Sequence, residues 1–171
     1  MIVLETRKLT RVYGKGETRF DALKGIDLKI YAGESVAIIG KSGSGKSTLM
    51  HLLALLDQPT SGDLFLLGRN VKGKKAAELN KLRNETFGFV FQQFFMNAKD
   101  TVHDNVMLPL KISGMRRNQR KKLVDEALQA VELGDKAKNK ASDLSGGQKQ
   151  RVCIARALVN KPKIIFADEP T

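Results

Sequence analysis

The stretch GKSGSGKST, residues 40–48, decides how the rest of the chain is organised. The short apolar run before it, SVAII at 35–39, is typical of a buried strand, and LMHLLALL at 49–56 is typical of a helix. Strand, glycine-rich loop and helix form the context in which the pattern G-x-x-x-x-G-K-[ST] binds phosphate. The sequence therefore predicts a loop that holds a nucleoside triphosphate.

Each position of this loop has a physical role. Gly40, Gly43 and Gly45 permit backbone angles that are closed to other residues, so successive amides can point at one anion. The helix that follows adds its free N–H groups and its positive dipole end at the same point. Lys46 can place a charge on the β- and γ-phosphates, and the Ser47 hydroxyl can bind Mg²⁺. The alternative, a glycine-rich turn that merely carries a lysine, fits the complete pattern and its flanks poorly.

The composition is that of an ordinary globular protein, with 171 residues, 42% hydrophobic and 28% charged. This length is enough for one domain with a hydrophobic core, either undivided or divided into two lobes. No apolar run approaches the length of a membrane span, and the first residues do not resemble a signal peptide. The single cysteine, Cys153, fits a reducing cytosol, and its apolar helical surroundings predict a buried, unreactive side chain.

The chain is strongly basic, with 30 Lys and Arg against 18 Asp and Glu and a net charge of +12. Three interpretations remain open: a solvated surface, attraction to an acidic membrane face, and nucleic-acid binding. No aromatic residues interleave the basic runs, so single-stranded nucleic acid would find no stacking platform. We favour a solvated surface and expect no nucleic-acid partner. The basic runs lie at 72–75, 116–122, 136–140 and 161–163.

Hydrophobic periodicity predicts the other elements. Apolar residues that alternate or run together indicate strands at 2–13 (a sheet edge), 20–31, 63–67, 87–91 and 164–167. Helical spacing indicates helices at 76–84, 102–112, 118–133 and 145–159. No strand is expected from 92 to about 160, which favours a helical lobe inserted into an α/β domain.

Two acidic residues, Asp168 and Glu169, follow the last predicted strand. A buried strand that ends in two carboxylates delivers both to the carboxyl edge of its sheet, beside the phosphate loop. Asp168 suits the role of holding Mg²⁺, directly or through water. Glu169 suits a general base for the water that attacks the γ-phosphate. Many strands end in acids, so the interpretation depends on the phosphate loop that accompanies it.

A second anion-binding helix end is predicted at LSGGQ, residues 144–148. Ser145 is a natural N-cap, and Gly146 and Gly147 leave the first amides uncovered. Taken alone, this pattern is also typical of a capped loop. One chain with two such helix ends favours an arrangement in which each triphosphate is held from two sides.

These motifs together resemble the nucleotide-binding domain of ATP-binding cassette (ABC) proteins. The loop at 40–48, LSGGQ at 144–148 with Gln150 and Arg151 behind it, and the acidic strand end at 168–169 follow the family order. The resemblance covers essentially the whole chain and implies an α/β fold of the P-loop NTPase type. It implies an antiparallel β edge, a mixed central sheet and an inserted helical subdomain. The catalytic lobe would comprise 1–93 and 161–171, and the helical lobe 94–160.

The resemblance also assigns roles to individual residues. Tyr13 would stack on adenine, although a tyrosine there could equally lie on the surface. Gln92 would contact Mg²⁺ and the attacking water, with Gln93 as the alternative. The implied catalytic residues are Glu169 and Gln92, and the implied metal ligands are Ser47, Gln92 and Asp168. The implied ATP-binding residues are Tyr13, Gly40, Lys41, Ser42, Gly43, Ser44, Gly45, Lys46, Ser47, Thr48, Ser145, Gly146, Gly147 and Gln148.

The sequence departs from the family pattern at its end. Family members continue past Asp-Glu-Pro-Thr with an interface loop, further strands and a catalytic histidine, and neither His51 nor His103 matches that histidine. We therefore expect the 171 residues alone to hydrolyse ATP slowly or not at all.

Segments 86–94 and 105–110 are similar to a subfamily that serves lipoprotein release and macrolide efflux. That likeness implies the ATPase subunit of an export or release transporter, peripheral to the inner face of the cell membrane in the cytoplasm. Its partners would be a separate transmembrane permease and a second copy of itself, in an ATP-dependent head-to-tail homodimer. The alternative is a non-transport ABC ATPase that regulates a membrane or cell-wall complex, as in cell division.

Overall fold

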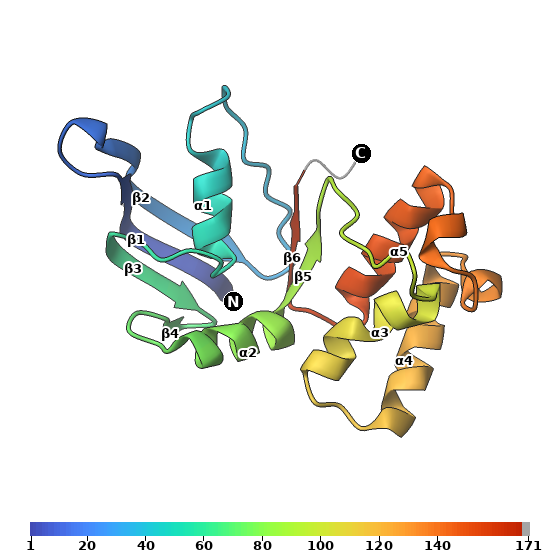
Figure 1. The fold of residues 1–171 in the computed structure, drawn as a ribbon. Helices are drawn as coiled ribbons and strands as arrows, with labels where there is room; N and C mark the ends of the chain where they lie inside the picture. Colours follow the sequence, from blue (N-terminus) through green and yellow to red (C-terminus); the bar gives the residue numbers. More distant parts are fainter. Residues whose placement is uncertain (169–171) are drawn as a thin grey trace. The chain divides into compact units, whose positions relative to one another are not determined.

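The structure, a computed structural model, describes residues 1–168 (Figure 1). It divides into two compact units, one of residues 1–79 and one that begins at residue 80. The first contains the phosphate loop, and the second contains the LSGGQ segment and the last strand.

The first unit is built on an antiparallel sheet. Its strands are β1 (Ile2–Tyr13), β2 (Phe20–Tyr31), β3 (Ser61–Leu66) and β4 (Arg69–Asn70), in the order β2-β1-β3-β4. The 3-10 turn η1 (Gly16–Thr18) connects β1 to β2. β1 pairs with β2 on one side and β3 on the other, so the prediction that residues 2–13 form an edge strand is wrong. Alternation reveals which face of a strand is buried, not how many strands pair with it.

One helix, α1 (Lys46–Leu53), packs against this sheet and contacts β2. Its second half is apolar because it supplies the unit's core, where Leu52 and Leu53 are fully buried. The helix begins directly after the phosphate loop, so burial of its far end fixes the position of the loop. The other buried apolar side chains of the unit are Val3, Leu4, Leu9, Leu23, Ala54, Leu55, Leu64, Leu66 and Val71.

The segment before the phosphate loop differs from the prediction. Residues 34–41 form no regular structure, and the apolar side chains of Val36, Ile38 and Ile39 are 45%, 38% and 89% exposed. A strand is stabilised by its neighbours in a sheet, and within residues 1–168 no strand pairs with this segment. The predicted buried strand at 35–39 is therefore not formed in this structure.

The second unit contains a parallel strand pair. Helix α2 (Ala76–Thr86) leads directly into β5 (Phe87–Val90), which pairs in parallel with β6 (Ile164–Ala167) in the register Phe87 to Ile164 and Val90 to Ala167. Aromatic rings line the pair, with Phe166 packed edge-on to Phe87 and stacked on Phe89. Both strands lie where periodicity predicted them.

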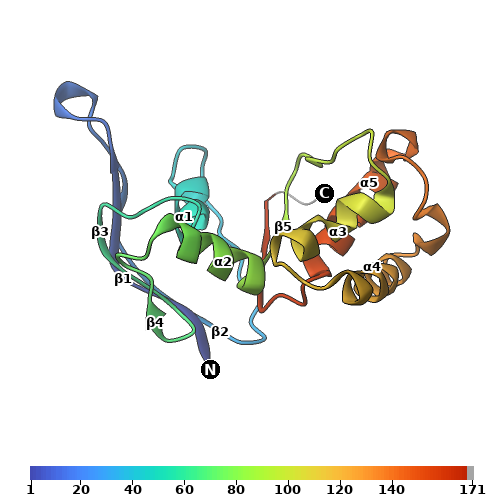
Figure 2. The same cartoon turned by 60° about the horizontal axis from the view of Figure 1, so that its bottom comes forward.

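Helices α3 (Val102–Ile112), α4 (Arg117–Ala130) and α5 (Gly146–Leu158) form the rest of this unit and gather around one core (Figure 2). Their connections are irregular apart from the short turns η2 (Gly134–Lys136) and η3 (Ala141–Asp143). No strand interrupts residues 92–160, which confirms that part of the prediction. The buried side chains of the core are Val102, Val106, Leu110, Val124, Leu128, Leu133, Leu144, Val152, Ala155 and Val159.

Candidate nucleotide-binding site

The phosphate loop has the backbone that its glycines predict. Gly43 and Gly45 have φ angles of +75° and +88°, a region that other residues rarely adopt. Gly45 is also the N-cap of α1, and a Cβ atom there would lie 2.6 Å from the carbonyl oxygen of Ala22 on β2. Only glycine therefore lets the loop pass this close to the sheet and turn into the helix.

Lys46, the first residue of α1, lies across the loop. Its Nζ donates hydrogen bonds to the carbonyl oxygens of Gly40, at 2.8 Å, and Lys41, at 2.9 Å. The first turn of α1 contains no acidic residue, so the lysine charge and the positive helix end act in the same direction. The start of α1 is therefore a region of positive charge, as the sequence predicted for an anion-binding loop.

The remaining predicted loop residues differ in their exposure. Lys41, Ser42, Ser44 and Ser47 are exposed, while Thr48 is partly buried on the helix. Ser47 follows Lys46 in the first turn of α1, so its hydroxyl is at the surface, where a metal ion could reach it. All these groups come from one continuous segment of the first unit.

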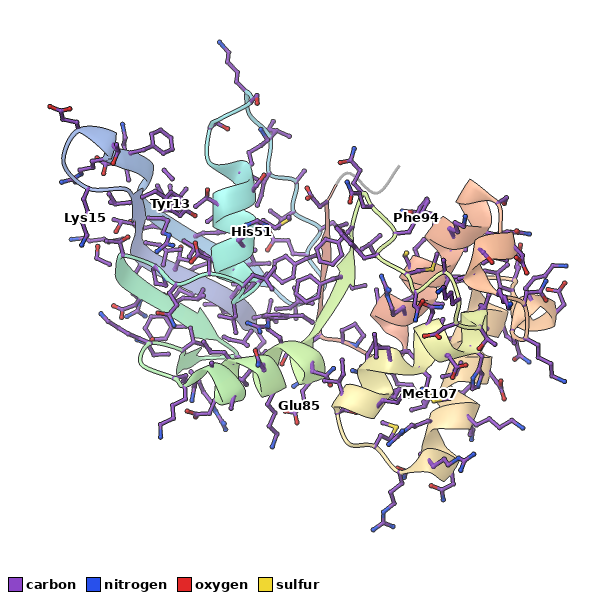
Figure 3. All side chains as sticks on the ribbon, viewed as in Figure 1. Tyr13, Lys15, His51, Glu85, Phe94 and Met107 are labelled. Carbon is purple, nitrogen blue, oxygen red and sulfur yellow. The ribbon has the colours of Figure 1, made fainter. Side chains whose placement is uncertain are left out.

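Tyr13 lies at the end of β1 and remains 38% exposed (Figure 3). Its hydroxyl donates to Asp57 Oδ2 at 3.0 Å, and the Arg11 guanidinium lies 4.5 Å from its ring centroid. Sequence reasoning predicted a role for Tyr13 but did not predict its contacts with Arg11 and Asp57. Arg11 could have been found, because residues two apart on a strand share a face, whereas Asp57 is distant in sequence and gave no signal.

Gln92 and Asp168 follow neighbouring parallel strands. The backbone N–H of Asp168 donates to the carbonyl of Val90, the last residue of β5, at 2.9 Å, and exposed Gln92 lies two residues beyond Val90. The second unit thus brings two of the three predicted metal ligands, Gln92 and Asp168, to the carboxyl ends of neighbouring strands. Glu169, the predicted general base, lies outside the described residues.

The LSGGQ segment opens α5 with a reciprocal cap. Ser145 Oγ accepts from the backbone N–H of Gln148 at 3.3 Å, and Gln148 Oε1 accepts from the N–H of Ser145 at 2.9 Å. The predicted N-cap is therefore confirmed, while the role of Gln148 in it was missed although S-x-x-Q is its signature. Gly146 and Gly147 are exposed, and Cβ atoms there would meet open space. The first amides of α5 are accordingly not crowded by side chains.

Side chains in the C-terminal half of α5 form hydrogen bonds to the backbone of the segment that follows Gln92. The Arg156 guanidinium donates to the carbonyls of Phe94, at 2.9 Å, and Phe95, at 2.8 Å. Cys153 Sγ also donates to the Phe94 carbonyl, at 3.2 Å. Burial raises the pKa of the Cys153 thiol, and the charge of Arg156 only partly opposes this, so the predicted buried thiol is confirmed.

Comparison with known families identifies the class of protein to which this site belongs. The sequence profile of the ABC transporter family matches residues 23–171. The match spans most of the chain, including the phosphate loop, the LSGGQ segment and the last strand, so the chain belongs to the ABC transporter family and is an ABC-type ATPase.

Within this family, the chain is similar to ATP-binding proteins of lipoprotein release and macrolide export. The chain is 47% identical to the lipoprotein-releasing system ATP-binding protein LolD of Geobacter metallireducens, over 99% of this chain and 75% of that one. It is also 47% identical to the macrolide export ATP-binding/permease protein MacB of Marinobacter nauticus, over 99% of this chain but 26% of that protein. The chain thus corresponds to the ATP-binding part of a longer protein in MacB.

Solved structures agree with the fold. The ATP-binding cassette MJ0796, solved as a dimer in a post-hydrolysis state with ADP and phosphate, superposes with a TM-score of 0.86. It is 42% identical and aligns with 98% of this chain and 74% of its own. The predicted fold class, an α/β ABC-type ATPase, is therefore confirmed. Among residues 1–168, none of the helices has the length and apolar character needed to cross a bilayer.

Proposed function

We propose that the chain binds Mg·ATP and hydrolyses it to power a separate transmembrane partner of the export or release type. One observation carries the ATP part of this proposal: the glycine-rich loop turns into α1 at Gly45, and the Lys46 ammonium group lies against the loop at the positive end of the helix. The similarity to LolD and MacB supports the export or release type.

The chemistry at the phosphates is electrostatic. Loop amides and Lys46 hold the β- and γ-phosphates in place and offset their charge, which is the main contribution that proteins make to phosphoryl transfer. Mg²⁺ would be held by the Ser47 hydroxyl, the Gln92 amide and the Asp168 carboxylate, which are the hard oxygen ligands that this ion prefers. The ion would supply positive charge that offsets the negative charge of the phosphates. Glu169 accepts a proton from the attacking water.

The assembly in which this happens is a head-to-tail homodimer. The dimeric structure of the similar MJ0796 cassette supports this assembly. In it, the exposed N-terminus of α5, from Ser145 to Gln148, would contact the nucleotide held by the partner's loop. The dimer would associate with a permease and so lie on the cytoplasmic face of the membrane.

The decisive experiment compares Glu169→Gln with Glu85→Gln in the full-length protein. Glu85 is an exposed residue of α2, so its variant controls for loss of one carboxylate. We expect Glu169→Gln to bind ATP normally and to lose phosphate release, because an amide cannot accept the proton. Glu85→Gln should retain both. Normal turnover in Glu169→Gln would remove this residue from the mechanism.

Location is tested separately by fractionating cells that produce the full-length protein. A peripheral subunit should sediment with membranes and be released by alkaline washing. Recovery of the protein only in the soluble fraction, with the permease present, would contradict membrane association.

A further inference from the structure

Tyr13 is held from two directions by Arg11 and Asp57. The Asp57 carboxylate accepts from the Tyr13 hydroxyl at 3.0 Å through Oδ2 and pairs with Arg11 Nη2 at 2.8 Å through Oδ1. Arg11 in turn places its guanidinium 4.5 Å from the centroid of the Tyr13 ring. The ring is therefore fixed at its hydroxyl and covered on one face.

This arrangement ties the strand to the helix of the phosphate loop. Asp57 lies just after α1, where its N–H donates to the carbonyl of His51 at 3.3 Å. Thr60, in the same segment, makes two hydrogen bonds to β1. The Thr60 N–H donates to the Thr10 carbonyl at 2.9 Å, and Thr60 Oγ1 accepts from the Val12 N–H at 2.9 Å. The Tyr13 ring and the last turn of α1 thus belong to one hydrogen-bonded network, and α1 itself begins at the phosphate loop.

The ion pair with Asp57 does not satisfy the whole Arg11 guanidinium, and the Tyr13 ring accounts for the rest of its position. Its Nε is buried and has no hydrogen-bond partner among residues 1–168. A buried donor without a hydrogen bond lowers the stability of the folded protein, so another interaction must favour this position of the side chain. A guanidinium over an aromatic face gains a cation–π contact, which is stronger when both groups are partly desolvated, and the Arg11 side chain is only 23% exposed.

We infer that Arg11 and Asp57 are positioning residues for the adenine base. They hold the Tyr13 ring as a platform with a single available face, at a fixed place relative to the phosphate loop. A pre-oriented ring loses less freedom when the base stacks on it, so the pair raises the contribution of the base to ATP affinity. This inference rests on the proposed function, because it requires that ATP occupies this loop.

The test separates the base from the phosphates. Titration calorimetry on the full-length protein would measure the affinity for Mg·ATP and for Mg·tripolyphosphate, which has no base. Arg11→Gln should weaken ATP binding about fivefold and leave tripolyphosphate binding unchanged. The matched control is Arg19→Gln, because Arg19 pairs with Asp21 at 3.2 Å in the same hairpin but is 63% exposed. It should change neither affinity.

Two further variants keep the inference testable if Arg11→Gln folds poorly. Arg11→Lys keeps the charge but loses the planar stack, and it should also lower the ratio of ATP to tripolyphosphate affinity. In a Tyr13→Ala background, Arg11→Gln should cause no additional loss, because Arg11 acts through the ring. An unchanged ratio in both Arg11 variants, or equal loss for both ligands, would overturn the inference. Failure of the wild type to bind ATP would instead overturn the proposed function.

Discussion

Lys46 Nζ donates a hydrogen bond to the carbonyl oxygen of Gly40 over a distance of 2.8 Å. The first residue of α1 is thereby tied to the first residue of the phosphate loop, and the second bond, to Lys41, reinforces the closure. The loop is therefore closed through its own contacts, with the lysine ammonium group bonded to two of its carbonyl oxygens.

Replacement of Lys46 tests this account of the loop. Lys46→Ala removes the charge that faces the phosphates and should weaken ATP binding at least tenfold, about 1.4 kcal/mol. Lys24→Ala, at an exposed position on β2, is the control and should bind as the wild type does. Calorimetry that finds the same affinity in both variants would exclude the proposed role of Lys46.

The two loop glycines should differ in their sensitivity to alanine. At Gly45 the added Cβ would lie 2.6 Å from the Ala22 carbonyl oxygen, whereas at Gly43 it would meet open space. Both positions have positive φ, so each substitution carries about 1–2 kcal/mol of backbone strain, and only Gly45→Ala adds a clash with the sheet. Urea denaturation should find Gly45→Ala the less stable variant. Equal midpoints would mean that the loop does not approach β2 as described.

Much of this structure could be predicted because the pattern is local. Helix α3 has the predicted bounds of 102–112. It could be predicted because its apolar spacing and its N-cap, Thr101, both lie within one short stretch of sequence. The N-cap at Ser145 and the strand at 164–167 were predictable for the same reason. Local chemistry also predicted the backbone of residues 40–48, where Gly43 and Gly45 have the expected positive φ angles.

What could not be predicted depends on partners distant in sequence. β1 lies inside the sheet because it pairs with β3 as well as β2. The sequence of residues 2–13 does not indicate this second pairing. The apolar run at 35–39 predicted a strand, but apolar character alone does not form one without a neighbour. Likewise, the salt bridge between Arg11 and Asp57 arises only when the segment after α1 folds back on β1.

The pKa of Asp104 makes the stability of α3 depend on pH. The Thr101 hydroxyl, 2.7 Å from Oδ2, holds this pKa below its usual range, and the charge of Lys111 contributes. Because the pKa is lowered by folding, the carboxylate stabilises the protein at neutral pH, and the contribution is lost as pH falls through the lowered pKa. The effect is small, since the side chain is 44% exposed.

Denaturation of Asp104→Asn at several pH values measures this effect. The variant should be less stable than wild type at neutral pH and should match it in acid below the lowered pKa. In a Thr101→Val background, which removes the hydroxyl, the neutral-pH difference should shrink. If the stability difference between wild type and Asp104→Asn grew as pH fell, the carboxylate would not stabilise α3 in the way described.

Cys153 should resist alkylation in the folded protein. Its side chain is 1% exposed and burial raises the pKa of the thiol, so at neutral pH it is both inaccessible and protonated. Iodoacetamide followed by mass spectrometry should find no modification until denaturant is added, when labelling becomes complete. Rapid labelling of the native protein would show that α5 does not bury this residue.

The central claim is that each ATP is held by the phosphate loop of one protomer and the Ser145 to Gln148 segment of its partner. Lys46→Ala disables the loop, and Gly147→Asp places a negative charge at the other segment. Full-length heterodimers of the two single variants, isolated with two affinity tags, have one intact site if the segments meet between protomers. The reciprocal heterodimer pairs wild type with a chain that carries both substitutions.

The decisive measurement is the rate of phosphate release by these two heterodimers. The account predicts about half of wild-type turnover for the pair of single variants if the two sites act independently, and less if they act together. It predicts no turnover for the wild-type and double-variant pair, in which both sites carry one substitution. The reverse result, with activity only in the pair that contains a wild-type chain, would mean that the two motifs meet within one protomer and would contradict the account.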